Sequence, residues 1–393
     1  MRIRCFALAS LLVLWTVLSV SCGGNQSTSP GSAQTGQILY ALSGATVTTY
    51  AVDPQLATIT PMGAPVTLAS LPSFIQFVPS SDDRFLYILW SDAHGNEHLS
   101  EYSTDSSGVP QTPAAQVANV PSLSQLTLHP SGSFAYAMEV TQSSGNSSGS
   151  SNTQYTADIR LLLIEAHTGN IRENPTVLAS YGPSYVWPAS LFGLSKDGKQ
   201  LYINYQGTSS GTAYRERSVN AHTGKLGPDV SLYGEAGLWN QTNTLAIGAE
   251  LIIDTYRSPG ATGYLDVLRN PPKSQALIHC TAAMLHACQS ASNVQLHPSG
   301  RYLFLTDPGT QQIQVAKINL SANKIESIGA SIPMTAQIPG FFFSPDGTLV
   351  YALLASDAIL HIYNFDSRSG QLTDTGITLA PPTVDTGFCP AKR

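Results

Sequence analysis

Charged residues are scarce in this sequence. Asp, Glu, Lys and Arg make up 11% of its 393 residues, whereas an average domain has about 25%. The 19 basic residues are outnumbered by 25 acidic ones, and no stretch of the chain gathers Lys or Arg into a cluster. The electrostatic surface that a nucleic-acid backbone requires is therefore missing, and we expect no DNA or RNA partner.

Long hydrophobic runs are also lacking, except at the N-terminus. Arg2 and Arg4 precede an apolar run over residues 6–18, which is shorter than a comfortable membrane span and typical of a secretory leader. Residues 18–22 end this run and resemble a bacterial lipobox, in which Cys22 becomes diacylated, although Ser19 stands where Leu is usual. Residues 23–36 have the Ser/Gly/Pro composition of a flexible tether.

These features predict three regions: a signal peptide at 1–21, a lipidated Cys22 with its linker at 22–36, and a folded domain at 37–393. We expect a protein of the bacterial cell envelope, held by its N-terminal lipid at the outer membrane or in the periplasm. Gly23 favours the outer membrane if sorting follows the enteric rule. The alternatives are a cleaved, soluble secreted form and an uncleaved membrane anchor.

Cysteine is rare, with five in the chain. Cys5 lies in the leader and Cys22 at the anchor, which leaves Cys280, Cys288 and Cys389. A short disulfide between Cys280 and Cys288 is favoured in an oxidising compartment, and Cys389 is then unpaired.

A metal site formed by these two cysteines with His279 and His286 is the alternative to the disulfide. This spacing matches no common zinc knuckle, and no second ligand pair is near it in the sequence. We expect no metal and no cofactor.

Five segments share one pattern: alternating apolar residues, a turn of Pro, Ser or Asp and Gly, then a second alternating run with an aromatic residue. They span residues 75–90, 126–138, 192–204, 294–306 and 341–354. The pattern indicates a strand, a tight turn and a paired strand. Because strand repeats of about 40 to 50 residues build propellers, we expect an all-β protein, a β-propeller of four-stranded antiparallel blades.

The spacing of the turns sets the number of blades. The turns lie at Pro79, Pro130, Lys196, Pro298 and Pro345, so the steps are 51, 66, 102 and 47 residues. The step of 102 spans two blades and places a degenerate blade near residues 244–269. A Ser/Gly/Asn tract at 142–154 lengthens one blade and predicts a mobile loop.

The two chain ends complete the ring. A second Gly-containing turn, between third and fourth strands, recurs at 103–109, 165–171, 220–226 and 366–372. Residues 50–59 fill this place in the first blade, which therefore begins at Gln37 with its second strand. Residues 386–393 align with the innermost strands and supply the missing one. Seven blades result, closed by pairing the ends; six remain possible if the 244–269 region is an insertion.

Polar residues for chemistry are sparse. His129 and His297 occupy equivalent turn positions where other blades have Val, Ser or Cys, so we expect them to be structural. In a propeller these turns lie on the face opposite the usual ligand mouth. On the face with the mouth, the sequence places His94, Glu97 and Asp307, which are weak catalytic candidates as base or oxyanion stabiliser. No spacing in the sequence selects these three residues.

A matched pair of aromatic segments is also expected on the face with the mouth. Tyr181 to Trp187 and Tyr233 to Trp239 have the same six-residue step in successive blades. Rings of this kind stack on a sugar or an apolar ligand, or they pack between blades. The ligand-binding candidates are Tyr185, Trp187, Tyr233, Trp239 and Asp357.

Residues 294–319 and 341–372, with their repeated Pro-x-Gly turn and Tyr-containing strand, resemble the seven-bladed lactonase-like propellers, which include the 6-phosphogluconolactonase type and the YVTN repeat proteins. The repeat pattern covers about residues 37–393. The resemblance implies the fold well and the activity poorly.

The sequence departs from that family where chemistry is expected. The lactonases carry a Gly-Pro-Arg-His stretch before one hairpin, whereas the equivalent approaches here, residues 120–125, 291–293 and 337–340, have no Arg or His. A sugar phosphate would require such cations. Our leading hypothesis is therefore a monomeric binding module for an envelope protein, a glycan or a small molecule. The alternative is a hydrolase that opens a lactone at the central mouth of the propeller.

Overall fold

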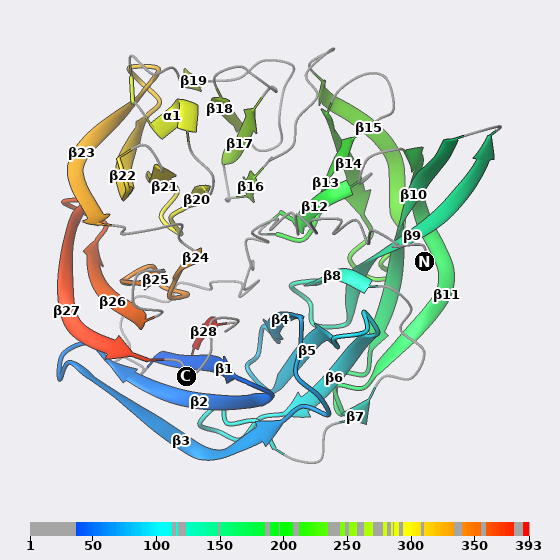
Figure 1. Ribbon diagram of the computed structural model, residues 1–393, viewed down its shortest axis with the longest axis horizontal. Coiled ribbons are helices and arrows are strands. Elements are labelled where there is room, and N and C mark those ends of the chain that lie inside the picture. Colours follow the sequence, from blue (N-terminus) through cyan, green and yellow to red (C-terminus); the bar gives the residue numbers. More distant parts are fainter. Residues whose placement is uncertain are drawn as a thin grey trace, which may run out of the picture.

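The computed structural model describes residues 37–111, 115–116, 123–147, 150–184, 189–195, 197–206, 212–234, 244–247, 251–257, 263–269, 278–280, 284–285, 287–290, 294–307, 310–333, 340–354, 359–380 and 388–392. Within these residues the strands form seven four-stranded sheets, and every pairing is antiparallel. Figure 1 shows the sheets as blades around a common axis. The predicted fold class is confirmed, and the six-bladed alternative is wrong.

The first three blades are described from the innermost strand outward. Blade 1 contains β28 (Phe388–Lys392), β1 (Gln37–Ser43), β2 (Thr46–Asp53) and β3 (Thr58–Thr67). Blade 2 contains β4 (Phe74–Pro79), β5 (Phe85–Ser91), β6 (Glu97–Ser103) and β7 (Ala115–Gln116). Blade 3 contains β8 (Leu123–Leu128), β9 (Phe134–Ser147), β10 (Ser150–Ile164) and β11 (Ile171–Ser184).

The remaining four blades follow in the same order. Blade 4 contains β12 (Ala189–Leu194), β13 (Gln200–Gln206), β14 (Thr212–Val219) and β15 (Leu226–Gly234). Blade 5 contains β16 (Thr244–Ile247), β17 (Leu251–Arg257), β18 (Gly263–Arg269) and β19 (Ile278–Cys280). Blade 6 contains β20 (Val294–Leu296), β21 (Tyr302–Asp307), β22 (Gln312–Asn319) and β23 (Lys324–Pro333). Blade 7 contains β24 (Gly340–Phe343), β25 (Leu349–Leu354), β26 (Ile359–Asp366) and β27 (Gln371–Leu379).

The hydrophobic core lies between blades. Every residue of β5 and of β21 is buried, because the second strand of a blade is covered on both of its faces by neighbouring blades. The buried clusters each span two adjacent blades: 1 and 2, 2 and 3, 3 and 4, 5 and 6, 6 and 7, and 7 and 1. Apolar residues on both faces of a strand therefore join one blade to the next.

The C-terminal strand closes the ring as the sequence predicts. β28 pairs with β1, with Cys389 opposite Tyr40. Val78 lies opposite Tyr87 in blade 2, so Cys389 occupies the equivalent position in blade 1. On the other side, Gln37 donates through Nε2 to Asp346 Oδ1 (3.0 Å) and accepts from the hydroxyl of Tyr351 (3.2 Å). Blades 7 and 1 are thus joined by polar as well as apolar contacts.

Buried tyrosines connect each of the first three blades to the next. The hydroxyls of Tyr40, Tyr87 and Tyr136 donate to the carbonyl oxygens of Gly108, Gly169 and Gly224, at 2.7, 2.9 and 2.8 Å. Each acceptor glycine has positive φ and lies in the turn between the third and fourth strands of the following blade. The recurring Tyr and Gly of the sequence are therefore partners in one contact.

His129 and His297 make the same kind of connection from the turn between the first and second strands. In His297, Nδ1 accepts from the backbone N–H of Ser299 (3.1 Å), which places the proton on Nε2, 2.8 Å from the carbonyl oxygen of Gly347 in the next blade. His129 repeats both contacts with Ser131 and Gly198. Their predicted structural role is confirmed.

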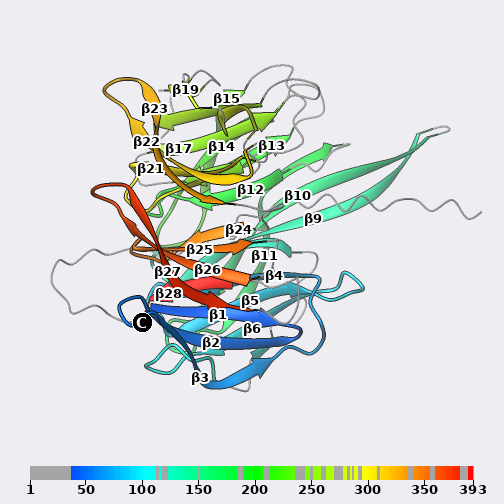
Figure 2. The same cartoon turned by 60° about the vertical axis from the view of Figure 1, so that its left-hand side comes forward.

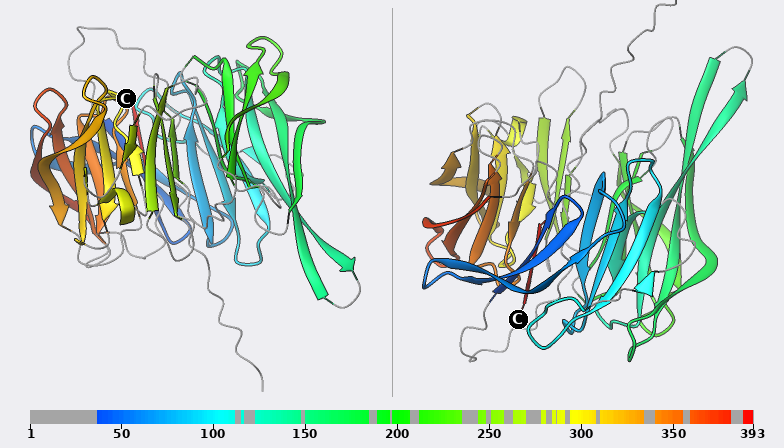
Figure 3. Two further views of the ribbon diagram at one scale, coloured as in Figure 1. Left: turned by 90° about the horizontal axis from the view of Figure 1, so that it is seen from above. Right: turned by 60° about the horizontal axis from the view of Figure 1, so that its bottom comes forward.

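One prediction about blade 3 is wrong. The tract at residues 142–154 was expected to be a loop, but strand pairing continues to Ser147 opposite Ser150. Figures 2 and 3 show this hairpin of β9 and β10 extending away from the ring. Backbone hydrogen bonds can extend a ladder regardless of side-chain polarity, and the tract contains no proline to interrupt them.

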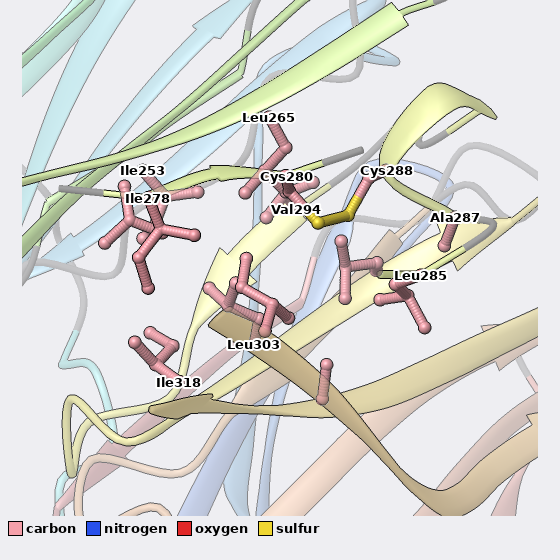
Figure 4. Packing of buried hydrophobic residues seen from close by; sticks show 14 of the residues in the cluster. Ile253, Leu265, Ile278, Cys280, Leu285, Ala287, Cys288, Val294, Leu303 and Ile318 are labelled. Carbon is pink, nitrogen blue, oxygen red and sulfur yellow. A yellow bond between two sulfur atoms is a disulfide. The ribbon is translucent and has the colours of Figure 1, made fainter. Parts of the chain in front are cut away.

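Blade 5 is the degenerate blade that the turn spacing predicts, and a short helix, α1 (Ala287–Ser290), follows it. The sulfur atoms of Cys280 and Cys288 lie at disulfide distance, with Cα atoms 5.8 Å apart, as the sequence predicts. Figure 4 shows this pair within the apolar cluster between blades 5 and 6. Among the described residues no helix is long and apolar enough to cross a membrane.

Candidate functional site

The two faces of the propeller differ. We call one the turn face: it carries the turns between first and second strands and between third and fourth strands, including residues 80–84, 104–108, 320–323 and 345–348. We call the other the loop face: it carries the connections between second and third strands, such as residues 92–96, and those entering the next blade, such as residues 68–73. The candidate residues of the sequence analysis that are described lie on the loop face.

The loop between β5 and β6 is organised by Asp92. Its Oδ1 accepts from the backbone N–H groups of His94 (2.8 Å) and Asn96 (2.9 Å), and Oδ2 accepts from the side-chain amide of Asn96 (2.8 Å). These hydrogen bonds to the charged form, led by those from Asn96, lower the pKa of Asp92 to about 2. Asp92 therefore carries a full negative charge at neutral pH.

His98 lies beside this charge. Its Nε2 is 3.8 Å from Asp92 Oδ2, close enough for an ion pair but too far for a hydrogen bond. The imidazole stacks on the indole of Trp90, with ring centroids 4.1 Å apart. Trp90 is itself fixed, because it is 1% exposed and its Nε1 donates to Ser100 Oγ (3.1 Å). His98 thus has a set orientation while about a third of its side chain stays open to solvent.

Ser73, from the connection between blades 1 and 2, supports the same loop. Its hydroxyl donates to the carbonyl oxygen of Asp92 (2.8 Å) and lies 3.0 Å from Ser91 Oγ, while its backbone N–H donates to the carbonyl oxygen of Ser91 (2.7 Å). A second element therefore holds the Asp92 backbone. The result is a partly exposed histidine beside a fixed carboxylate, an arrangement suited to accepting and returning a proton.

Sequence reasoning did not select Trp90 and His98. A signal was present, since a hairpin over residues 85–103 with a turn at 92–96 places Trp90 directly opposite His98. Cross-strand neighbours of this kind touch, so the pair could have been found by assigning the register.

The sequence-predicted catalytic residues do not come together. His94 is exposed on the Asp92 loop and Glu97 begins β6, both in blade 2. Asp307 ends β21 in blade 6, separated from blade 2 by blades 7 and 1. It is 0% exposed and accepts from Thr310 Oγ1 (2.9 Å) and Gln314 Nε2 (3.2 Å), so its carboxylate anchors a loop.

Blade 3 supports this interpretation of Asp307. Glu139, like Asp307, is the sixth residue of the second strand of its blade. It is 5% exposed and pairs with Arg160 from the third strand, with Arg160 Nε 2.5 Å from Glu139 Oε2. Both acidic residues bond to a side chain diagonally across the same hairpin. In both blades, therefore, a buried acidic residue at this position of the second strand has a structural role.

Most of the predicted ligand-binding residues lie outside the residues that the structure describes. These are Tyr185, Trp187, Trp239 and Asp357, and the same holds for the lipidation site Cys22. For Tyr233 the structure describes the backbone alone, which lies in β15 opposite Tyr214. Tyr181, which begins the first aromatic segment, is buried and accepts from Arg217 Nε of the next blade (2.9 Å). The Tyr181 side chain therefore packs between blades 3 and 4, which was the alternative to ligand binding for this aromatic segment.

The metal alternative is not supported by the cysteines, because Cys280 and Cys288 are bonded to each other. In the described part of the chain, no group of three or more His, Cys, Asp or Glu side chains is arranged to hold a metal ion.

The chain is similar to one protein family and to several solved structures. The model of the lactonase family, a seven-bladed β-propeller, matches residues 272–385. A candidate 6-phosphogluconolactonase from Bacteroides uniformis superposes with a TM-score of 0.62 at 15% identity, over 90% of this chain and 99% of that one. The periplasmic gluconolactonase of Pseudomonas aeruginosa gives 0.60 at 15%, over 90% and 99%. A Lactobacillus plantarum protein gives 0.60 at 13%, also over 90% and 99%.

At such identities the solved structures show the fold alone. No curated protein matches the chain by sequence. The family match and the structural neighbours together support a lactonase-like propeller.

Proposed function

We propose that this protein is a hydrolase that opens a lactone at the loop face, with His98 as the general base. The observation that carries the proposal is the oriented, partly exposed imidazole of His98 beside the ionised carboxylate of Asp92. The lactonase-like fold supports it, because one structural neighbour is named a candidate 6-phosphogluconolactonase and another a gluconolactonase. A hydrolase therefore replaces a binding module as our leading hypothesis for the function.

The reaction requires only water and the lactone. His98 takes a proton from water, whose oxygen attacks the lactone carbonyl carbon, and the carbonyl electrons move to oxygen. When the carbonyl re-forms, the ring C–O bond breaks and the leaving oxygen receives the proton from His98. The product is a hydroxy acid and the base is regenerated. Asp92 stabilises the imidazolium that forms between the two steps, and His94, exposed on the same loop, is the candidate donor to the carbonyl oxygen.

We propose a neutral lactone as the substrate class. Asp92 and Glu97 give the loop of blade 2 negative charge, and Arg160 of the neighbouring blade is already paired with Glu139. A phosphate group would be repelled by these carboxylates and would need cationic side chains in compensation.

The test compares glucono-lactone with its 6-phosphate in a pH-stat, corrected for spontaneous opening. We expect turnover of the neutral lactone, and a fall in kcat/KM of about 10²- to 10⁴-fold for His98→Ala, as is typical of removing a general base. His222→Ala is the matched control, because His222 is an exposed histidine in a turn on the other face. Unchanged turnover in His98→Ala, or no turnover of any lactone, would refute the proposal.

A binding function is the second candidate. It is favoured by the separation of His94 and Glu97 from Asp307 on different blades, which leaves no shared catalytic cluster among these three. In that case the aromatic residues Trp187 and Trp239 would stack on a glycan or apolar ligand. Calorimetric titration with envelope glycans would detect this binding, and Trp187→Ala with Trp239→Ala should abolish it.

We also propose export and acylation at Cys22. The leader and the lipobox-like residues support it, as does a Cys280–Cys288 disulfide, which persists in oxidising compartments. Mass spectrometry of the N-terminal peptide from membranes should find a diacylated Cys22, and Cys22→Ala should remain unacylated and leave the membrane fraction.

A further inference from the structure

The first described residue fixes where the chain enters the propeller. Gln37 begins β1 and is bonded to Asp346 and Thr348 of the turn between the first two strands of blade 7. That turn belongs to the turn face. The segment between Cys22 and the folded domain is therefore attached at the turn face, beside the junction of blades 7 and 1.

The length of that segment limits which face can reach a bilayer. Gly23 to Gly36 are fourteen residues rich in Ser and Gly, and a chain of this kind has a root-mean-square span of about 20 Å. The seven residues of β1 lead across the blade from turn face to loop face, a rise of about 23 Å, before any loop is added. Contact of the loop face with the bilayer would require the tether to be stretched along the side of the molecule.

The turn face carries exposed leucines in two of its turns between third and fourth strands. Leu56 is 72% exposed in the β2–β3 turn of blade 1, and Leu320 is 44% exposed in the β22–β23 turn of blade 6. These blades lie on either side of blade 7. Asp53 accepts from the backbone N–H of Leu56 (3.0 Å), and Asn319 accepts from that of Ala322 (3.0 Å), so both turns are held in shape before any contact is made.

Charge on this part of the turn face does not itself favour an anionic membrane. Three cations, Arg301, Lys324 and Arg368, stand among four carboxylates, those of Asp53, Asp346, Asp366 and Glu326, and Lys324 is paired with Glu326. The signs are mixed, so apolar contact and the tether would hold the surface. Leucines at interfaces bury their side chains at the boundary of headgroups and acyl chains.

We propose that the turn face rests on the lipid bilayer, with Leu56 and Leu320 inserted at its surface, and that the loop face points away from the membrane. The proposal depends on the anchoring through Cys22 proposed above. In this orientation the Asp92–His98 site opens toward soluble substrate. The end of the extended β9–β10 ladder, where Ser147 pairs with Ser150, also lies at the loop face, so this hairpin projects away from the lipid (Figure 3).

The test places an environment-sensitive fluorescent amino acid at position 56, 320 or 71. Leu71 is the matched control, since it is 59% exposed on the loop face, in the connection that also contains Ser73. Chains of residues 22–393 with Cys389→Ser are coupled through Cys22 to maleimide lipid in vesicles of phosphatidylethanolamine and phosphatidylglycerol containing a nitroxide-labelled lipid quencher.

We expect fluorescence at positions 56 and 320 to fall at least about twofold, because inserted side chains lie about 5–10 Å into the interface, and fluorescence at 71 to stay unchanged. A Leu56→Asp substitution should weaken the quenching at 320. Quenching at 71 instead, or at none of the three positions, would overturn the proposal, the latter indicating a tethered domain whose turn face is free for a protein partner.

Failure of the anchoring proposal is separable from failure of this one. Chemical coupling supplies the tether in the vesicle experiment, so its result does not depend on acylation in the cell. An unacylated Cys22 in membranes from cells would refute the anchoring, whereas the quenching pattern alone decides the orientation.

Discussion

At the scale of single residues, two histidines make the fold sensitive to acid. Burial lowers the pKa of His129 and His297 below the ordinary value of about 6.5, and Nδ1 of each already accepts a backbone hydrogen bond. Protonation would add a proton to Nδ1, where it would point at the backbone N–H that donates to this atom. The stability contributed by the neutral rings is therefore complete above about pH 6.5 and is lost as pH falls through the lowered pKa.

We expect the urea midpoint to fall between pH 7.5 and pH 5, and His297→Gln to reduce that fall while costing about 1–3 kcal/mol at pH 7.5 through the lost contact with Gly347. Equilibrium unfolding followed by circular dichroism measures both. His222→Gln, at an exposed histidine, is the control. A pH dependence unaltered by His297→Gln would mean that other groups cause the acid sensitivity.

A glutamate acts in the opposite direction. Glu101 is 4% exposed between blades 2 and 3, and burial raises its pKa to about 7, with a further rise from Glu165, although its carboxylate accepts from the N–H of Ile171 (3.2 Å). Because the native pKa exceeds the unfolded one, this group favours folding at low pH and loses that contribution as pH rises from about 4.5 to 7.

Glu101→Gln keeps an acceptor for Ile171 and removes the buried charge. We expect it to raise the free energy of unfolding at pH 8 by about 1–3 kcal/mol and to change it little at pH 5. Parallel denaturation curves at the two pH values give the comparison, and a loss of stability at pH 8 would show that the charge is stabilising.

At the scale of elements, the tight turns are contacts between blades as well as ends of hairpins. Gly347 has φ +75° and a Cβ there would lie 2.5 Å from His297 Nε2, whereas Gly300, in the same turn of the preceding blade, has φ +69° and open space around it. The two glycines share a backbone conformation and differ in what surrounds them.

An alanine at each position separates the two effects. We expect Gly300→Ala to cost about 1 kcal/mol from backbone strain alone, and Gly347→Ala to cost about 2–4 kcal/mol because the His297 contact is also displaced. Thermal unfolding of the two variants measures the difference. Equal losses would show that His297 moves aside without cost.

Some of these strands and hairpins could be predicted from the sequence, and others could not. Alternating apolar residues on either side of a tight turn predicted the first two strands of blades 2, 6 and 7, because a buried two-sided strand leaves a strong pattern. The hairpin at residues 142–154 was missed, since its pairing comes from backbone groups that a Ser/Gly tract does not reveal. His94 was placed on the right loop, but His98 beside Asp92 emerges only from the register of β5 with β6.

At the scale of the whole molecule, ring closure depends on the last residues of the chain. β28 covers the inner edge of β1, whose first six residues are all buried, and Gln37 bonds across to blade 7. Without β28, an apolar strand edge would be open to solvent and to other chains.

Deleting residues 387–393 should therefore lower the thermal midpoint strongly and promote aggregation, while deleting Arg393 alone should leave both nearly unchanged. Differential scanning calorimetry and light scattering provide the readouts. Because the missing strand is short and its site on β1 is preformed by β2, a synthetic peptide of residues 386–393 should raise the midpoint of the truncated chain in proportion to the logarithm of its concentration above its Kd. Full stability of the truncated chain without peptide would show that the ring is held by blade packing alone, which would shift the explanation of closure from strand pairing to the apolar clusters between blades 7, 1 and 2.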